Sequence, residues 1–309
     1  ISLASGALGL STGLAYATAR HSTTEEVISL ASKVNKYGGI YATHLRDEFD
    51  TILDVLAEAF EIGETAKLPV VVSHLKCAGP DNWGRSEEVL NFINNSKYNH
   101  RINLDCYPYA AGSSTLDLGQ VDERIKILIT WSENHPEQSK KTLAEIAREW
   151  GVSQIEAARK LQPAGAVYFS INEDDMTRII SHPKTMIGSD GLPHDPHPHP
   201  RLWGTFPRVL GRLARDQKLF SLSTAVHKMT GLPARNFRIK NRGLVQVGYA
   251  ADLVVFDAEK IADTATFENP KQTSIGIERV FVNGIESFRD GSTTGRRAGT
   301  FIQSQKPEE

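Results

Sequence analysis

Short apolar runs alternate with amphipathic segments along the first two-thirds of the chain. Residues 38–44 and 68–74 are apolar and rich in β-formers, and 101–109 and 184–190 are two further predicted strands. The Val run in the second is continuous, which is typical of a strand buried on both faces of a parallel sheet. Strands that alternate with helices predict an α/β protein.

Four segments between and before these runs have helical periodicity. Acidic residues follow Thr23, Thr24 and Ser86, so the expected N-caps are Thr23 or Thr24 for the first helix and Ser86 for the third. The expected helices are 21–38, 49–65, 86–95 and around 176–181.

The pattern changes at two places, which divides the chain. Between Tyr109 and Phe169 the alternation loosens, which indicates an insertion of about residues 110–170. Within it, residues 126–161 are expected to form one strand-like piece and two amphipathic helices. After Asn236 the chain is β-rich, with turn signals such as Asn283-Gly284. We therefore expect a barrel domain over residues 1–236 and a small β domain with a C-terminal tail over 237–309.

Three of the predicted strands run into polar residues: His44, His74 and Asp190. Strands that end this way favour a (β/α) barrel, where chemistry gathers at the strand C-termini. A doubly wound sheet would show a Gly-rich phosphate turn, and the sequence has none. Two imidazoles and a carboxylate suit zinc. A histidine after a strand is also often a packed or hydrogen-bonded residue with no metal. No local motif such as HExxH decides between this structural role and a metal ligand.

Composition and charge limit the binding partners and the location that the sequence favours. The net charge is −2 without a basic block, so nucleic acid is a poor partner. The uncharged residues 1–19 are broken by glycines and too polar for a membrane span. Two cysteines, Cys77 and Cys106, are too few for a disulfide framework, so a reducing, cytoplasmic location is expected. The oligomeric state stays open.

Six segments together resemble the N-acyl-D-amino-acid deacylases (D-aminoacylases) of the amidohydrolase superfamily. The order and spacing of the segments match as well as their local sequence, whereas the last one is shared more widely across amidohydrolases. The segments are GALGLSTGLAY, IYATHLRDE, VVVSHLKCAG, DCYPYAAGSST, IGSDGLPHDPHPHPRLWGTFPR and GYAADLVVFD. The implied fold is an incomplete TIM-like (β/α)8 amidohydrolase barrel with an insertion and a small C-terminal β domain.

The resemblance implies zinc-dependent hydrolysis of N-acyl-D-amino acids to a carboxylate and a D-amino acid. His44 and His74 correspond to two zinc ligands, and Asp190 to the general base and acid. A clamp for the substrate α-carboxylate is implied as well. Its members are Lys76, Tyr107 and Arg201, with Tyr109 as the alternative to Tyr107.

Other interpretations remain at this stage. Without the family resemblance, the sequence favours solvated surface charges as the interpretation of Lys76 and Arg201. Arg124 and Lys126 are candidates for meeting an acidic substrate side chain, or surface charges, so the side-chain preference stays open. His194, His197 and His199 lie among prolines, which favours a rim loop that positions Arg201 over a second metal cluster.

The chain also departs from the family pattern. That pattern starts with an HxH motif on the first barrel strand and a metal-binding cysteine, and neither precedes His44. We therefore expect further residues upstream that complete the zinc site. The rivals are a cyclic-amide hydrolase of the dihydroorotase or hydantoinase kind and an inactive truncated barrel.

Overall fold

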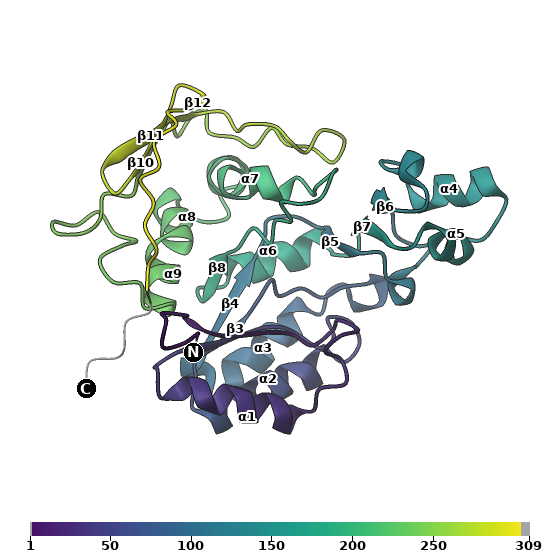
Figure 1. The fold of residues 1–309 in the computed structure, drawn as a ribbon, viewed down its shortest axis with the longest axis horizontal. Coiled ribbons are helices and arrows are strands. Elements are labelled where there is room, and N and C mark those ends of the chain that lie inside the picture. The colour runs from purple at the N-terminus through teal and green to yellow at the C-terminus, as the bar shows by residue number, and fades with distance from the viewer. Residues whose placement is uncertain (1, 304–309) are drawn as a thin grey trace.

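A five-stranded parallel sheet forms the centre of the molecule (Figure 1). The structure, a computed structural model, describes residues 2–303; residue 1 and residues 304–309, which the expected domains include, lie outside the described residues. The strand order is β1-β2-β3-β4-β8, and every neighbouring pair is parallel. All five carboxyl ends therefore meet at one edge. The strands are β1 Gly9–Gly13, β2 Ile40–His44, β3 Val70–Val72, β4 Ile102–Cys106 and β8 Thr185–Ile187.

Helices connect the strands, as the periodicity predicts, and α1, α2 and α3 lie on one side of the sheet (Figure 1). Thr23 caps α1, because its side chain accepts a hydrogen bond from the backbone N–H of Glu26 at 3.2 Å. Helix α2 buries one face, including Leu56 and Ile62, against the sheet. The helices are α1 Thr24–Asn35, α2 Ile52–Ala66, α3 Ser86–Asn95 and α6 Glu173–Ser181.

The predicted N-cap Ser86 is wrong. Arg85 holds the cap position, and Ser86 is the first residue of α3. Asp175 of α6 accepts hydrogen bonds from the backbone N–H groups of Gly84 and Ser86 at 2.7 and 3.1 Å. A carboxylate from another helix thus satisfies donors that a local cap would otherwise serve.

Residues 112–168, within the expected insertion, form a separate layer with its own core. It holds a three-stranded antiparallel sheet of order β5-β7-β6 and two helices, at one end of the molecule (Figure 1). The expected strand and two helices within residues 126–161 are confirmed as β6, α4 and α5. The sequence analysis did not identify β5 and β7, because β5 is polar and β7 is short and contains glycine, so neither has a recognisable pattern. The elements are β5 Gly112–Thr115, β6 Ile127–Ser132, α4 Leu143–Trp150, α5 Gln154–Leu161 and β7 Ala164–Tyr168.

Helices and a small antiparallel sheet complete the chain. The sheet has the order β12-β11-β10-β9. Its hairpins turn at Asn283-Gly284 and Asp290-Gly291, where all four residues have positive φ, the conformation that Asn-Gly and Asp-Gly favour. The elements are α7 Arg201–Arg208, a π-helical segment Val209–Asp216, α8 Leu222–Met229, α9 Gly231–Asn236, β9 Leu253–Phe256, β10 Ile277–Val282, β11 Ile285–Arg289 and β12 Ser292–Thr293.

Two further expectations concern single features. Cys77 and Cys106 form no disulfide and are buried thiols that pack in the main core, and burial raises the pKa of each to about 12. Among the described helices, none is both long and apolar enough to cross a membrane.

Candidate active site

The carboxyl edge of the parallel sheet carries the polar residues that the sequence singles out. His44 ends β2, His74 lies two residues after β3, and Asp190 lies three residues after β8. His74 and Asp190 have φ values of 39° and 47°. Non-glycine residues adopt this left-handed conformation at a cost and keep it where the surroundings hold them.

The two histidines meet directly. Nδ1 of His44 lies 2.9 Å from Nε2 of His74, and the rings are edge-on with centroids 4.5 Å apart. Burial lowers the pKa of His44 to about 4, so its imidazole is neutral near pH 7. A neutral imidazole has a lone pair that a metal ion can bind.

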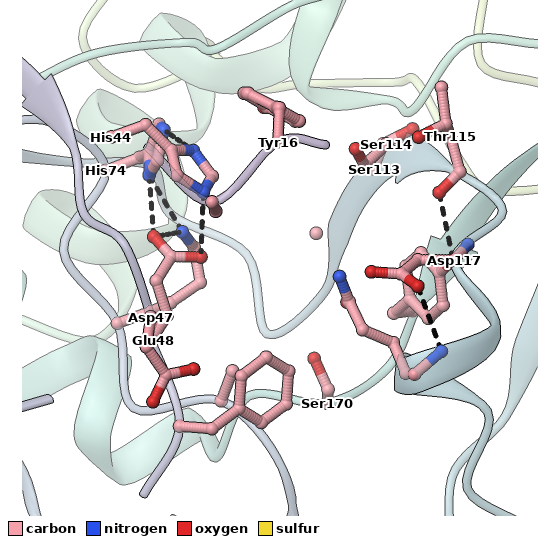
Figure 2. Close-up of a pocket in the computed structure, with 18 of the residues that line it drawn as sticks. Tyr16, His44, Asp47, Glu48, His74, Ser113, Ser114, Thr115, Asp117 and Ser170 are labelled. Carbon is pink, nitrogen blue, oxygen red and sulfur yellow. Dashed lines mark hydrogen bonds and ion pairs between the residues drawn. The ribbon is translucent and has the colours of Figure 1, made fainter. Parts of the chain in front are cut away.

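Glu48 joins this pair, although the sequence analysis missed it. Its Oε1 lies 3.1 Å from Nδ1 of His74, its Oε2 lies 3.8 Å from Nε2 of His44, and it forms an ion pair with Lys76 (Figure 2). Burial by itself would raise the pKa of Glu48, but Lys76 and His74 outweigh it and hold that pKa below its usual range. The carboxylate is therefore ionised near pH 7.

The donor set fits a zinc ion. Within residues 2–303, His44, Glu48 and His74 form a group whose nitrogen and oxygen atoms lie within 4.8 Å of one another. Neutral imidazoles with a nearby carboxylate are the ligands and ligand supports that zinc prefers. Asp190 is not in this group, and its Oδ2 instead pairs with Nη2 of Arg201 at 2.7 Å.

A cavity of about 960 Å³ opens beside the histidines and contains every predicted site residue. Figure 2 shows His44, His74 and Glu48 on one side of it. On the other side lie residues of β5 and the loop that follows: Ser113, Ser114, Thr115 and Asp117. The insertion thus supplies a wall of the cavity. The predicted residues that line it are His44, His74, Lys76, Tyr107, Asp190 and Arg201.

The three predicted clamp residues lie together and are buried. Arg201 is 1% exposed and Lys76 is 8% exposed, which excludes the interpretation as solvated surface charges. The guanidinium carbon of Arg201 lies 4.5 Å from the ring centroid of Tyr107, and Nζ of Lys76 lies 5.8 Å from it. Burial raises the pKa of Tyr107 to about 12, so its hydroxyl keeps its proton.

Several polar atoms of this cluster have no partner. Within the described part of the chain, the Tyr107 hydroxyl and Nε and Nη1 of Arg201 are buried without a hydrogen bond. Unpaired buried donors cost free energy, which indicates that a ligand satisfies them. The alternative residue Tyr109 does not line the cavity; its ring packs against Arg208 and His199.

Asp105, a second residue that the sequence analysis missed, holds the backbone of His74. Its Oδ1 accepts a hydrogen bond from the His74 backbone N–H at 2.7 Å. Gly188 leaves room for this carboxylate, because a Cβ there would lie 2.9 Å from Oδ1. Burial raises the pKa of Asp105. The sequence identifies INLDC only as part of a strand, and nothing in its pattern indicates this role.

The histidine-rich loop does not form a metal cluster. Nε2 of His197 bonds the carbonyl of Phe267 at 2.7 Å, and Nε2 of His199 bonds that of Ala111 at 3.0 Å. Nδ1 of His199 accepts the backbone N–H of Arg201 at 2.9 Å, while His194 is exposed. The loop therefore holds the start of α7, and with it Arg201, in place.

The two cations considered for an acidic substrate lie elsewhere. Arg124 is more than half exposed and pairs with Asp81 and Asp122. Lys126 lies over the ring of Phe169 at 4.8 Å. Neither lines the cavity.

The sheet, the histidine pair and the cavity are those of an amidohydrolase. The model of the amidohydrolase family matches residues 99–287, and the chain belongs to that family.

Comparison with individual proteins confirms the resemblance to the D-amino-acid deacylases. Over 97% of its length the chain is 50% identical to a D-aminoacylase of Alcaligenes xylosoxydans xylosoxydans. It is 47% identical over 95% to an N-acyl-D-aspartate deacylase and 45% identical over 93% to an N-acyl-D-glutamate deacylase of that organism. It spans about three fifths of these relatives, 62%, 59% and 59% of their lengths.

Solved structures agree. The fold matches a D-aminoacylase crystal structure with a TM-score of 0.95 and 51% identity, over 98% of this chain and 64% of that one. It also matches an N-acyl-D-glutamate deacylase from Bordetella bronchiseptica, complexed with zinc and a phosphonate mimic of the tetrahedral intermediate. There the TM-score is 0.92 and the identity 44%, over 96% of this chain and 63% of that one. The predicted fold class is confirmed.

The hydrogen bond to His74 can be tested through stability. Asp105→Ala leaves the His74 N–H buried without an acceptor, which we expect to lower the free energy of unfolding by about 1–3 kcal/mol in urea denaturation. Asp105→Asn keeps an acceptor oxygen and should lose less. Glu61→Ala, an exposed change in α2, is the control and should stay within about 0.5 kcal/mol of the original chain. Equal stability of the Ala and Asn variants would contradict this role.

Proposed function

We propose that the protein hydrolyses the amide bond of N-acyl-D-amino acids to a carboxylate and a D-amino acid, with zinc as its metal. One observation carries the proposal: unpaired buried donors of Arg201 and Tyr107 lie in the same cavity as the His44–His74 pair. The deacylase relatives support it, since the similarity runs through nearly the whole of this chain.

The cluster suits a substrate that carries a free α-carboxylate. Arg201 offers Nε and Nη1, two donors of a planar guanidinium that match two carboxylate oxygens. The Tyr107 hydroxyl is a third donor, and Lys76 adds positive charge beside the same ring. Binding at the carboxylate would hold the scissile amide against the histidine pair, which orients it for attack.

His44 and His74 would hold the zinc ion. When bound, zinc acts as a Lewis acid toward the amide carbonyl and lowers the pKa of water toward ~7. The relative from Bordetella bronchiseptica was solved with zinc, and the paired ring nitrogens of His44 and His74 suit the same ion.

Asp190 is the proposed general base and acid. Arg201 anchors its Oδ2 at 2.7 Å, which orients the carboxylate within the cavity. Asp190 would take a proton from the attacking water and deliver it to the nitrogen of the leaving amine. One residue thus serves both proton transfers, because the water and the leaving group act in turn.

Three wider inferences accompany this function. We propose that residues 1–236, with the insertion at about 110–170, and residues 237–309 are two domains. The two unpaired thiols favour a cytoplasmic location. A small molecule is the proposed partner, and the net charge of −2 argues against nucleic acid.

A substrate panel tests the function. We expect N-acetyl-D-amino acids to be hydrolysed, and their L-enantiomers, hydantoins and dihydroorotate not. The α-carboxamide of a good substrate should lose most of kcat/KM, because it cannot form the charged pair with Arg201. The assay measures released amine with the protein as its gene encodes it, loaded with zinc. Hydrolysis of hydantoin or dihydroorotate in place of the linear amides would instead support a cyclic-amide hydrolase.

The role of Asp190 has its own test. Asp190→Asn keeps the shape of the side chain but removes the basic oxygen, so kcat should fall at least 100-fold, the lower range for a lost general base. Zinc content, measured by plasma mass spectrometry, should stay near that of the original protein. Glu173→Gln, a change at an exposed surface ion pair, is the matched control. An active Asp190→Asn enzyme would exclude this assignment.

A further inference from the structure

Glu48 lies in the loop between β2 and α2, four residues after His44. Its side chain is 12% exposed and contacts both histidines and Lys76, which are the groups that the proposed function needs. An ionised carboxylate at this place acts on each of them.

The contacts of His74 make its two ring nitrogens unequal. Nε2 faces His44, and Nδ1 faces Oε1 of Glu48 at 3.1 Å. A carboxylate can only accept hydrogen bonds, so in the neutral form of the ring this contact places the proton on Nδ1 and the lone pair on Nε2. Nε2 is the nitrogen turned toward its partner histidine.

Lys76 could stabilise the other tautomer of His74, which is protonated on Nε2. Its Nζ lies 2.8 Å from the same Nδ1 of His74. An ammonium can only donate, so without Glu48 it would favour a bare Nδ1 and move the ring proton to Nε2. Oε1 of Glu48 instead accepts hydrogen bonds from both Lys76 and His74. The carboxylate thus decides which nitrogen of His74 is free.

We propose that Glu48 is a positioning residue that fixes the metal-binding tautomer of His74 and holds the ammonium of Lys76 in the cavity. The proposal rests on the proposed function in taking His74 as a metal ligand. A carboxylate behind a metal-bound histidine commonly orients its ring, and loss of such a partner lowers metal affinity about 10–100-fold. Glu48 acts from the Nδ1 side of His74, away from the nitrogen that faces His44.

The test uses zinc alone and the protein as its gene encodes it. Glu48→Gln should weaken zinc binding about 10–100-fold in competition with a fluorescent chelator. In the metal-free protein labelled with ¹⁵N-histidine, the His74 signal, assigned with His74→Asn, should change from the Nδ1–H to the Nε2–H form. Glu58→Gln is the control: it removes a comparably buried ion pair, with Arg46, through a carboxylate that bonds neither histidine, and should change neither readout.

Each outcome decides the proposal. An unchanged zinc affinity in Glu48→Gln overturns it. Weaker zinc binding with an unchanged His74 tautomer also overturns it, in favour of Glu48 as a direct ligand. If the variant does not fold, the original metal-free protein suffices, because an Nε2–H His74 there excludes the proposed role. No readout involves substrate, so a protein without deacylase activity would refute the function and leave this test intact.

Discussion

The approach of His44 to His74 across two neighbouring strands is the contact on which the site depends. In the parallel register Thr43 pairs with Val72, so His44 is level with Ser73 rather than with His74. The left-handed turn at His74, φ 39°, brings its ring back to 2.9 Å from that of His44. Asp105 holds this turn through the backbone N–H. The histidine pair is therefore made by strand register, a local turn and a neighbouring strand together.

The charged side chains around that contact form ion pairs. Glu48 faces Lys76, and Asp190 faces Arg201, all of them at the carboxyl edge of the sheet. Removing ions from water is expensive, and a buried pair compensates only where its remaining atoms are satisfied. Glu48 is satisfied, whereas Arg201 retains two unpaired donors. The Glu48–Lys76 pair therefore supports the site, whereas the Asp190–Arg201 pair keeps donors available for a ligand.

Much of this arrangement follows from the sequence. Apolar runs that end on His44, His74 and Asp190 predict the parallel strands and their common edge, because the signal is local and periodic. The family resemblance adds Lys76, Tyr107 and Arg201, which the structure brings into one cavity.

Other features could not be predicted, for physical reasons. Glu48 lies in an irregular loop. Outside a helix, its spacing of four residues from His44 does not predict which way the side chain points. Asp105 acts through a backbone contact between strands, which depends on register. Strands β5 and β7 have no alternation, and their pairing within the insertion gives them their structure.

The central claim is that His44 and His74 together hold the metal. X-ray absorption at the zinc edge tests it directly, with the protein loaded with one equivalent of zinc and His74→Ala measured beside it. The account predicts two imidazole scatterers, at about 2.0–2.1 Å from zinc, and one fewer in the variant. A zinc shell without imidazole, or one that the variant leaves unchanged, would contradict it.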